Sequence, residues 1–134
     1  MTSSRKDIAA ERKRTGTHNC AQAVVCTYAD VAALDEATAR SVGAAFAAGM
    51  GNMEGTCGAL VGAGIVLGCA LPHPGDAMKA QRRLMTSFQK RCGATQCRLL
   101  KGVGAERALR QCPDCVSDAC EFLEEELRAA NKRL

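Results

Sequence analysis

The nine cysteines are the residues of this 134-residue chain with the most distinctive chemistry. Their thiolates can act as nucleophiles or as ligands for soft metals. The start of the chain has no apolar segment that could serve as a signal peptide, so we expect a cytoplasmic protein. In that compartment, cysteine-rich chains more often bind metal or carry out thiol chemistry than hold structural disulfides. The cysteine content therefore predicts redox or metal chemistry.

Four of the cysteines fall where helices are predicted to begin. They are Cys20, Cys57, Cys97 and Cys112. Asn19 is a good N-cap for the first, and Pro113 favours the first helical turn after the last. Free backbone N–H groups and the positive end of the helix dipole favour a thiolate, or an anionic sulfur cluster, over a neutral thiol. These four side chains are therefore the leading candidate site.

The segment "CPDC" permits two other interpretations. The C-x-x-C spacing of Cys112 and Cys115 suits a redox disulfide, with either residue as the attacking thiolate. It also suits two ligands of one metal, and extension back through Cys92 and Cys97 gives C-x4-C-x14-C-x2-C, a spacing close to that of tetrahedral zinc sites.

The remaining cysteines are expected to be structural. Cys26 and Cys120 fall inside predicted helices, while Cys69 and Cys92 fall near helix C-termini, where the dipole disfavours a thiolate. The ordinary interpretation for these four is a small buried hydrophobic side chain.

The elements that must position the cysteines are predicted to be helices. Ala, Leu, Arg and Glu are abundant, and β-branched residues form no alternating runs. The predicted helices cover residues 3–14, 19–34, 35–49, 57–71, 76–92 and 95–102, with a last helix starting at residue 112. We expect one all-α domain over residues 1–134, a compact bundle of about five to seven helices around a central glycine-rich apolar helix.

That central helix, residues 57–71, is the most apolar segment. Residues 55–71 carry no charge, but their length is at the short limit of a membrane span, so a core helix is the better interpretation. Gly58 and Gly62, like Gly64 and Gly68, are four residues apart and should allow neighbouring helices to approach closely. The helix would be easiest to bury completely in a homodimer.

The charge distribution and the remaining motifs limit which kinds of partner we expect. Residues 79–110 carry nine Lys or Arg against the single Glu106, without interleaved aromatic residues that could stack on bases. We therefore expect solvated helix faces that could meet an acidic redox partner, and we expect neither nucleic acid nor a membrane. His18 could assist Cys20, although an exposed polar side chain is the more ordinary interpretation. No C-x-x-C-H is present for covalent c-type haem.

The arrangement of cysteines resembles the family of redox-active proteins labelled C…GCAxxG…C…C. The matching segments are "NCAQAV", "GTCGALVGAGIVLG", "TQC" and "CPDCVSDA", in the expected order from residue 19 to 119. The central motif departs from the label, because Cys57 precedes Gly58 instead of following a glycine. The chain is also similar to the cluster-bearing part of split-Soret cytochromes, although their haem attachment sites have no counterpart here.

The resemblance implies a small helical domain whose four motif cysteines, Cys20, Cys57, Cys97 and Cys112, bind an iron–sulfur cluster. Electron transfer or redox sensing is the first hypothesis for the function. The alternatives are a thiol–disulfide oxidoreductase using Cys112 and Cys115, and a module that binds zinc or another soft metal.

Overall fold

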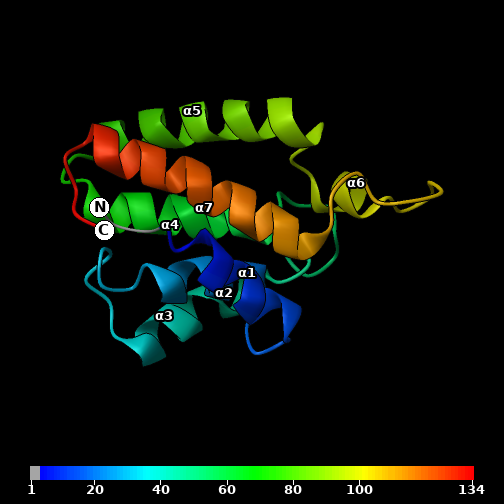
Figure 1. The fold of residues 1–134 in the computed structure, drawn as a ribbon, viewed down its shortest axis with the longest axis horizontal. Coiled ribbons are helices and arrows are strands. Elements are labelled where there is room, and N and C mark those ends of the chain that lie inside the picture. Colours follow the sequence, from blue (N-terminus) through cyan, green and yellow to red (C-terminus); the bar gives the residue numbers. More distant parts are fainter. Residues whose placement is uncertain (1–3) are drawn as a thin grey trace.

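The computed structural model describes residues 4–134, and in that range it contains seven α-helices and no β-strand (Figure 1). The helices are α1 (Lys6–Arg14), α2 (Cys20–Thr27), α3 (Glu36–Gly43), α4 (Gly58–Ala70), α5 (Pro74–Cys92), α6 (Cys97–Lys101) and α7 (Cys112–Ala129), and a single 3-10 turn, η1 (Ala44–Phe46), follows α3. The prediction of an all-α fold is confirmed.

Helix α4 lies at the centre of the bundle and contacts α2, α5 and α7. Figure 1 shows α4, α5 and α7 side by side, with α1, α2 and α3 forming the other half of the molecule. Helix α6 and the loop that follows it extend from the end where α7 begins. Because α4 buries its apolar side chains within one chain, its hydrophobicity gives no independent argument for a homodimer.

Two glycines of α4 allow it to contact η1 and α2 closely, as predicted. A Cβ at Gly58 would lie 2.7 Å from the carbonyl oxygen of Phe46, and a Cβ at Gly62 would lie 2.8 Å from that of Ala21. A Cβ at Gly64 would lie 3.2 Å from the side-chain nitrogen of Gln81, whereas nothing lies within 4 Å of a Cβ at Gly68. The prediction of close approach is therefore wrong at Gly68.

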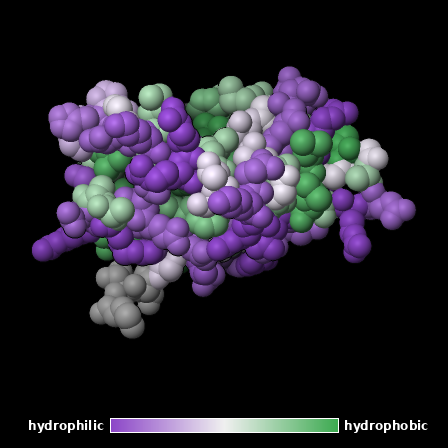
Figure 2. Space-filling view, turned by 90° about the horizontal axis from the view of Figure 1, so that it is seen from above, coloured by the Kyte–Doolittle hydropathy of each residue, from purple (hydrophilic) through white to green (hydrophobic). Residues whose placement is uncertain are grey.

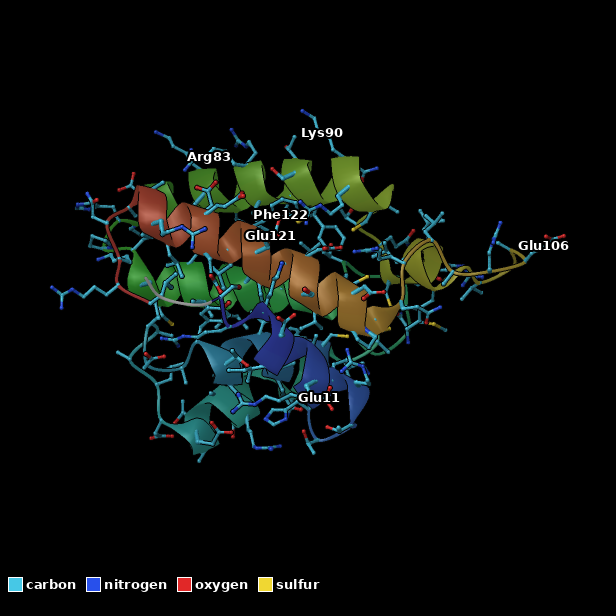
Figure 3. The ribbon with its side chains drawn as sticks, in the orientation of Figure 1. Glu11, Arg83, Lys90, Glu106, Glu121 and Phe122 are labelled. Atoms are coloured by element: carbon cyan, nitrogen blue, oxygen red, sulfur yellow. The ribbon has the colours of Figure 1, made fainter. Side chains whose placement is uncertain are left out.

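Helices α5 and α7 are amphipathic, and their apolar faces contribute to the core. The buried residues of α5 are Ala80, Leu84, Phe88 and Cys92, at the four-residue spacing that places side chains on one helix face. The opposite face carries basic side chains such as Arg83 and Lys90 (Figure 3). Seen from above, the surface is largely hydrophilic with separate hydrophobic patches (Figure 2).

The first and last helices are joined by a buried carboxylate. Glu124 of α7 is 3% exposed and accepts hydrogen bonds from the Ser4 hydroxyl at 3.0 Å and the Arg5 amide at 2.9 Å. The hydroxyl of Tyr28, which is fully buried, also donates to this carboxylate. Nη1 of Arg128 donates to the other carboxylate oxygen at 3.4 Å, so four donors compensate the burial of one charge.

Two helices end earlier in the structure than the sequence predicted. The segment predicted to be helical to residue 34 ends at Thr27, because the chain turns there and Ala33 adopts a φ of +58°. The segment predicted to continue to residue 49 ends as α3 at Gly43, followed by η1, and Ala47 is extended. None of the helices in residues 4–134 has the length and hydrophobicity needed to cross a membrane.

Candidate cysteine site

Five cysteines line one cavity of about 140 Å³ near the beginnings of α2, α4, α6 and α7. They are the four predicted residues, Cys20, Cys57, Cys97 and Cys112, together with Cys115. The cavity is several times larger than the space that one water molecule requires. The structure thus gathers the predicted set around one volume and adds a fifth thiol to it.

Local capping fixes the position of Cys20. The side chain of Asn19 accepts a hydrogen bond from the Gln22 amide at 2.8 Å, and the Gln22 side chain accepts one from the Asn19 amide at 3.0 Å. This capping box starts α2 at Cys20, as predicted. A Cβ at Gly58 would lie 3.2 Å from the Cβ of Cys20, so the absence of a side chain there lets α4 begin beside Cys20.

Backbone hydrogen bonds join the segments that carry Cys57 and Cys97. The Cys57 amide donates to the carbonyl of Thr95 at 2.8 Å, and the Cys97 amide donates to that of Gly55 at 3.0 Å. Gly49 lies against Cys97 and has a φ of +57°. A Cβ at Gly49 would be only 2.4 Å from the Cβ of Cys97. The loop before α4 therefore tolerates only glycine at this point beside the cavity.

The cysteines form two hydrogen-bonded pairs across the cavity. The thiol of Cys20 donates to the sulfur of Cys112, which lowers the pKa of Cys112 to about 6 and raises that of Cys20. The thiol of Cys115 donates to the sulfur of Cys57, which also accepts from the backbone amides at the start of α4. The pKa of Cys57 is consequently lowered and that of Cys115 raised, so Cys57 loses its proton before Cys115 does.

Three cationic side chains, Lys13, Lys101 and Arg110, also line the cavity, and none of the described residues around it is acidic. The pKa of Cys97 is nevertheless raised, chiefly by burial. Arg110 is held by a hydrogen bond from its Nε to Asp118 at 2.8 Å. The site is therefore suited to a group with negative charge.

The other cysteines lie outside this cavity. Cys92, which the zinc hypothesis requires, instead donates to a carboxylate oxygen of Asp118 at 3.3 Å. Cys26 and Cys120 are buried, as predicted. Cys69 is exposed, so its interpretation as a buried hydrophobic residue is wrong; it lies on a solvent-facing side of α4, while Leu67 and Leu71 on either side of it in the sequence are buried.

His18 does not line the cysteine cavity, and it is not exposed. Its side chain is buried beside α3, where Nε2 lies 3.2 Å from Nη2 of Arg40 and 3.7 Å from Oε1 of Glu36. Burial, followed by the charge of Arg40, lowers the pKa of His18. The prediction of an exposed histidine is wrong because α3 covers this side of α2.

Sequence reasoning left the role of Cys115 open and missed the cations at the cavity. The first-turn position of Cys115, three residues after Cys112, is the signal that places both sulfurs on one side of α7. Lys13, Lys101 and Arg110 come from three separate segments, and no local pattern links them.

Comparison with known proteins gave one match. Residues 18–126 match the sequence model of a family described as "Putative redox-active protein (C_GCAxxG_C_C)". Searches of curated proteins and of solved structures gave no match. The matched range begins just before Cys20 and includes all five cysteines of the cavity.

Proposed function

The chain belongs to the C_GCAxxG_C_C family, and from this premise we propose that its cysteine cavity binds an iron–sulfur cluster for electron transfer or redox sensing. The family and the nine cysteines fit a redox or metal-binding role. The observation that carries the finer proposal is the convergence of Cys20, Cys57, Cys97 and Cys112 on one cavity. Four thiolates are the usual ligand set of such clusters.

The width of the site supports a cluster over a single ion. Four sulfurs around one zinc ion lie about 3.8 Å apart, given a Zn–S bond of about 2.3 Å. Among residues 4–134, the one group of three or more potential ligands within 4.8 Å of one another does not include any cysteine of the cavity. Sulfurs spread around a larger volume suit several metal ions better than one.

The electrostatics of the cavity support the same proposal. Cys57 and Cys112 have lowered pKa values, and Lys13 and Lys101 would offset the negative charge of a thiolate-bound cluster. When bound, an iron–sulfur cluster supplies one-electron transfer. Cys20, Cys57 and Cys97 are buried and would hold the cluster away from solvent, while the cations at the cavity would favour its reduced form.

Thiol–disulfide chemistry is the second candidate, and the two hydrogen-bonded pairs favour it. In this case Cys112 would pair with Cys20, and Cys57 with Cys115, instead of Cys112 with Cys115. Formation of each disulfide from a thiol and a thiolate would transfer two electrons to an oxidised dithiol or quinone acceptor and release one proton. A structural zinc site on Cys92, Cys97, Cys112 and Cys115 has less support, because Cys92 lies outside the cavity.

The proposal includes an acidic redox protein as the partner. Lys101 lines the cavity, and it belongs to the basic segment 79–110, which also contains exposed basic residues of α5 and α6. Leu99, on α6, is 53% exposed and could supply an apolar contact within this basic surface. Such a surface would steer an acidic partner toward the cavity.

The test is anaerobic purification of the protein, followed by measurement of iron, acid-labile sulfide and the visible spectrum. We expect a brown protein that contains both iron and sulfide. Cys57→Ser should lose the colour and the iron, because it removes a buried ligand. Cys69→Ser is the matched control and should retain both, since Cys69 is exposed and lies outside the cavity.

The same preparations separate the alternatives. A colourless, iron-free protein that reversibly loses pairs of thiols on oxidation would support the disulfide function instead. One zinc ion retained in both Cys20→Ser and Cys57→Ser would support the structural zinc site.

A further inference from the structure

A second group of potential metal ligands lies between α2 and α3, outside the cysteine cavity. It consists of His18, Cys26 and Glu36, whose ligand atoms all lie within 4.8 Å of one another. His18 precedes α2, Cys26 lies in its last turn, and Glu36 begins α3. The capping box that starts α2 and the Asp35 cap that starts α3 therefore fix the elements that bring the three together.

Hydrogen bonding fixes the tautomer of His18 in the form that a metal requires. The Thr17 hydroxyl donates to the carbonyl of Arg12 at 3.2 Å, and its oxygen lies 2.8 Å from Nδ1 of His18. Nη2 of Arg40 can only donate, so Nε2 of His18 accepts from it and Nδ1 carries the ring proton, which it donates to Thr17. The lone pair is therefore on Nε2, which is the nitrogen that lies 3.7 Å from Glu36.

A cation already lies against this lone pair. Nη2 of Arg40 is 3.2 Å from Nε2 of His18, and its Nε is 3.7 Å from Glu36. The Arg40 side chain is 44% exposed, so it can move into solvent without opening the core. A metal ion would thus replace the Arg40 guanidinium, so the site already holds a positive charge in the same position.

We propose that His18, Cys26 and Glu36 bind a divalent transition-metal ion, zinc above all. Imidazole nitrogen, thiolate sulfur and carboxylate oxygen each bind zinc, and zinc sites with three protein ligands hold water in the fourth position. His18 and Cys26 are 8% and 6% exposed and form a fixed pair, while the exposed Glu36 completes the site from the surface. On binding, Arg40 moves aside and the Cys26 thiol loses its proton to solvent.

The test is equilibrium dialysis of the full-length, iron-loaded protein against Zn²⁺, with zinc and iron measured in the same samples. We expect Cys26→Ser and His18→Ala each to remove one zinc per chain while iron stays constant. Glu36→Gln, an exposed substitution, should weaken binding about tenfold or more. Cys69→Ser is the matched control for loss of one thiol and should bind zinc as the unaltered chain does.

Arg40→Gln provides a test that does not remove a ligand. Removal of the competing positive charge should tighten Zn²⁺ binding by about tenfold. X-ray absorption of the bound zinc should show one sulfur among its ligands. Equal zinc content in the unaltered chain and in Cys26→Ser, or no stoichiometric zinc in either the unaltered chain or Arg40→Gln, would overturn the proposal. Iron content reports separately on the cysteine cavity, so the two proposals can fail independently.

Discussion

The Cys115 thiol donates a hydrogen bond to the sulfur of Cys57, although these residues lie in the first turn of α7 and at the N-cap of α4. The bond raises the pKa of Cys115 and lowers that of Cys57, where amides of α4 also donate. Cys112 receives the same kind of bond from Cys20. The two cysteines of "CPDC" thus interact with other helices, and their charges differ.

The first prediction concerns the reactivity of Cys112 in the metal-free protein. Its pKa is about 6, chiefly because of the hydrogen bond from Cys20, so the rate of its alkylation should rise through a midpoint near pH 6. Cys20→Ala removes the donor and should move this midpoint upward, toward the ordinary range of about 8.5. The measurement is the iodoacetamide rate against pH, with mass spectrometry to identify the residue.

The sign of the pKa shift also fixes its contribution to stability. The folded Cys112 releases its proton at a lower pH than the unfolded one, so its contribution is present above the unfolded pKa and is lost as the pH falls through about 6. An unchanged alkylation midpoint in Cys20→Ala would contradict the assigned hydrogen bond.

The second prediction concerns Gly49 beside Cys97. Gly49→Ala would place a Cβ 2.4 Å from the Cβ of Cys97 and should displace that side chain, lowering stability and, under the iron–sulfur proposal, the iron content. Gly51→Ala is the matched control, because Gly51 also has a positive φ but has nothing within 4 Å of its Cβ position. Its expected effect is backbone strain alone, about 1–2 kcal/mol, with iron content retained. Iron analysis and denaturant unfolding measure both effects.

The third prediction compares two glycines of α4. Gly62→Ala would bring a Cβ to 2.8 Å from the Ala21 carbonyl oxygen and should push α2 and α4 apart, at a cost of about 1–3 kcal/mol. Gly68→Ala meets nothing within 4 Å and should stabilise the helix by about 0.5–1 kcal/mol. Urea unfolding of the two variants should therefore give changes of opposite sign; equal changes would show that Gly62 is not needed for close packing.

The fourth prediction tests the cations under the iron–sulfur proposal. Lys101 lines the cavity, so Lys101→Gln should lower the reduction potential on the order of tens of mV, since a nearby positive charge favours the reduced state. Arg107→Gln is the control, because Arg107 is exposed and outside the cavity. Voltammetry at low salt measures both, and equal shifts would indicate a general charge effect.

The sequence predicted which cysteines lie at helix N-termini wherever a local signal specifies the start of the helix. Asn19 and Pro113 mark the beginnings of α2 and α7, and both helices begin where expected. The prediction failed where tertiary contacts override propensity. The alanine-rich segment 44–49 favours a helix, yet it leaves helical geometry after Phe46 because Gly49 must lie against Cys97.

The burial of His18 could not be predicted for a related reason. It depends on how α3 packs against α2, and that contact involves residues far apart in sequence, such as Gly43 and Gln22. Nothing near His18 in the sequence indicates that α3 will cover it.

The Tyr28–Glu124 hydrogen bond gives the protein a natural optical reporter. The chain has one tyrosine and no tryptophan, so this single buried phenol is the principal near-ultraviolet chromophore of the apoprotein. Its hydroxyl donates a hydrogen bond to the Glu124 carboxylate, which also accepts hydrogen bonds from Ser4 and Arg5. Release of the first helix from the last should therefore change the near-ultraviolet circular dichroism without any introduced label.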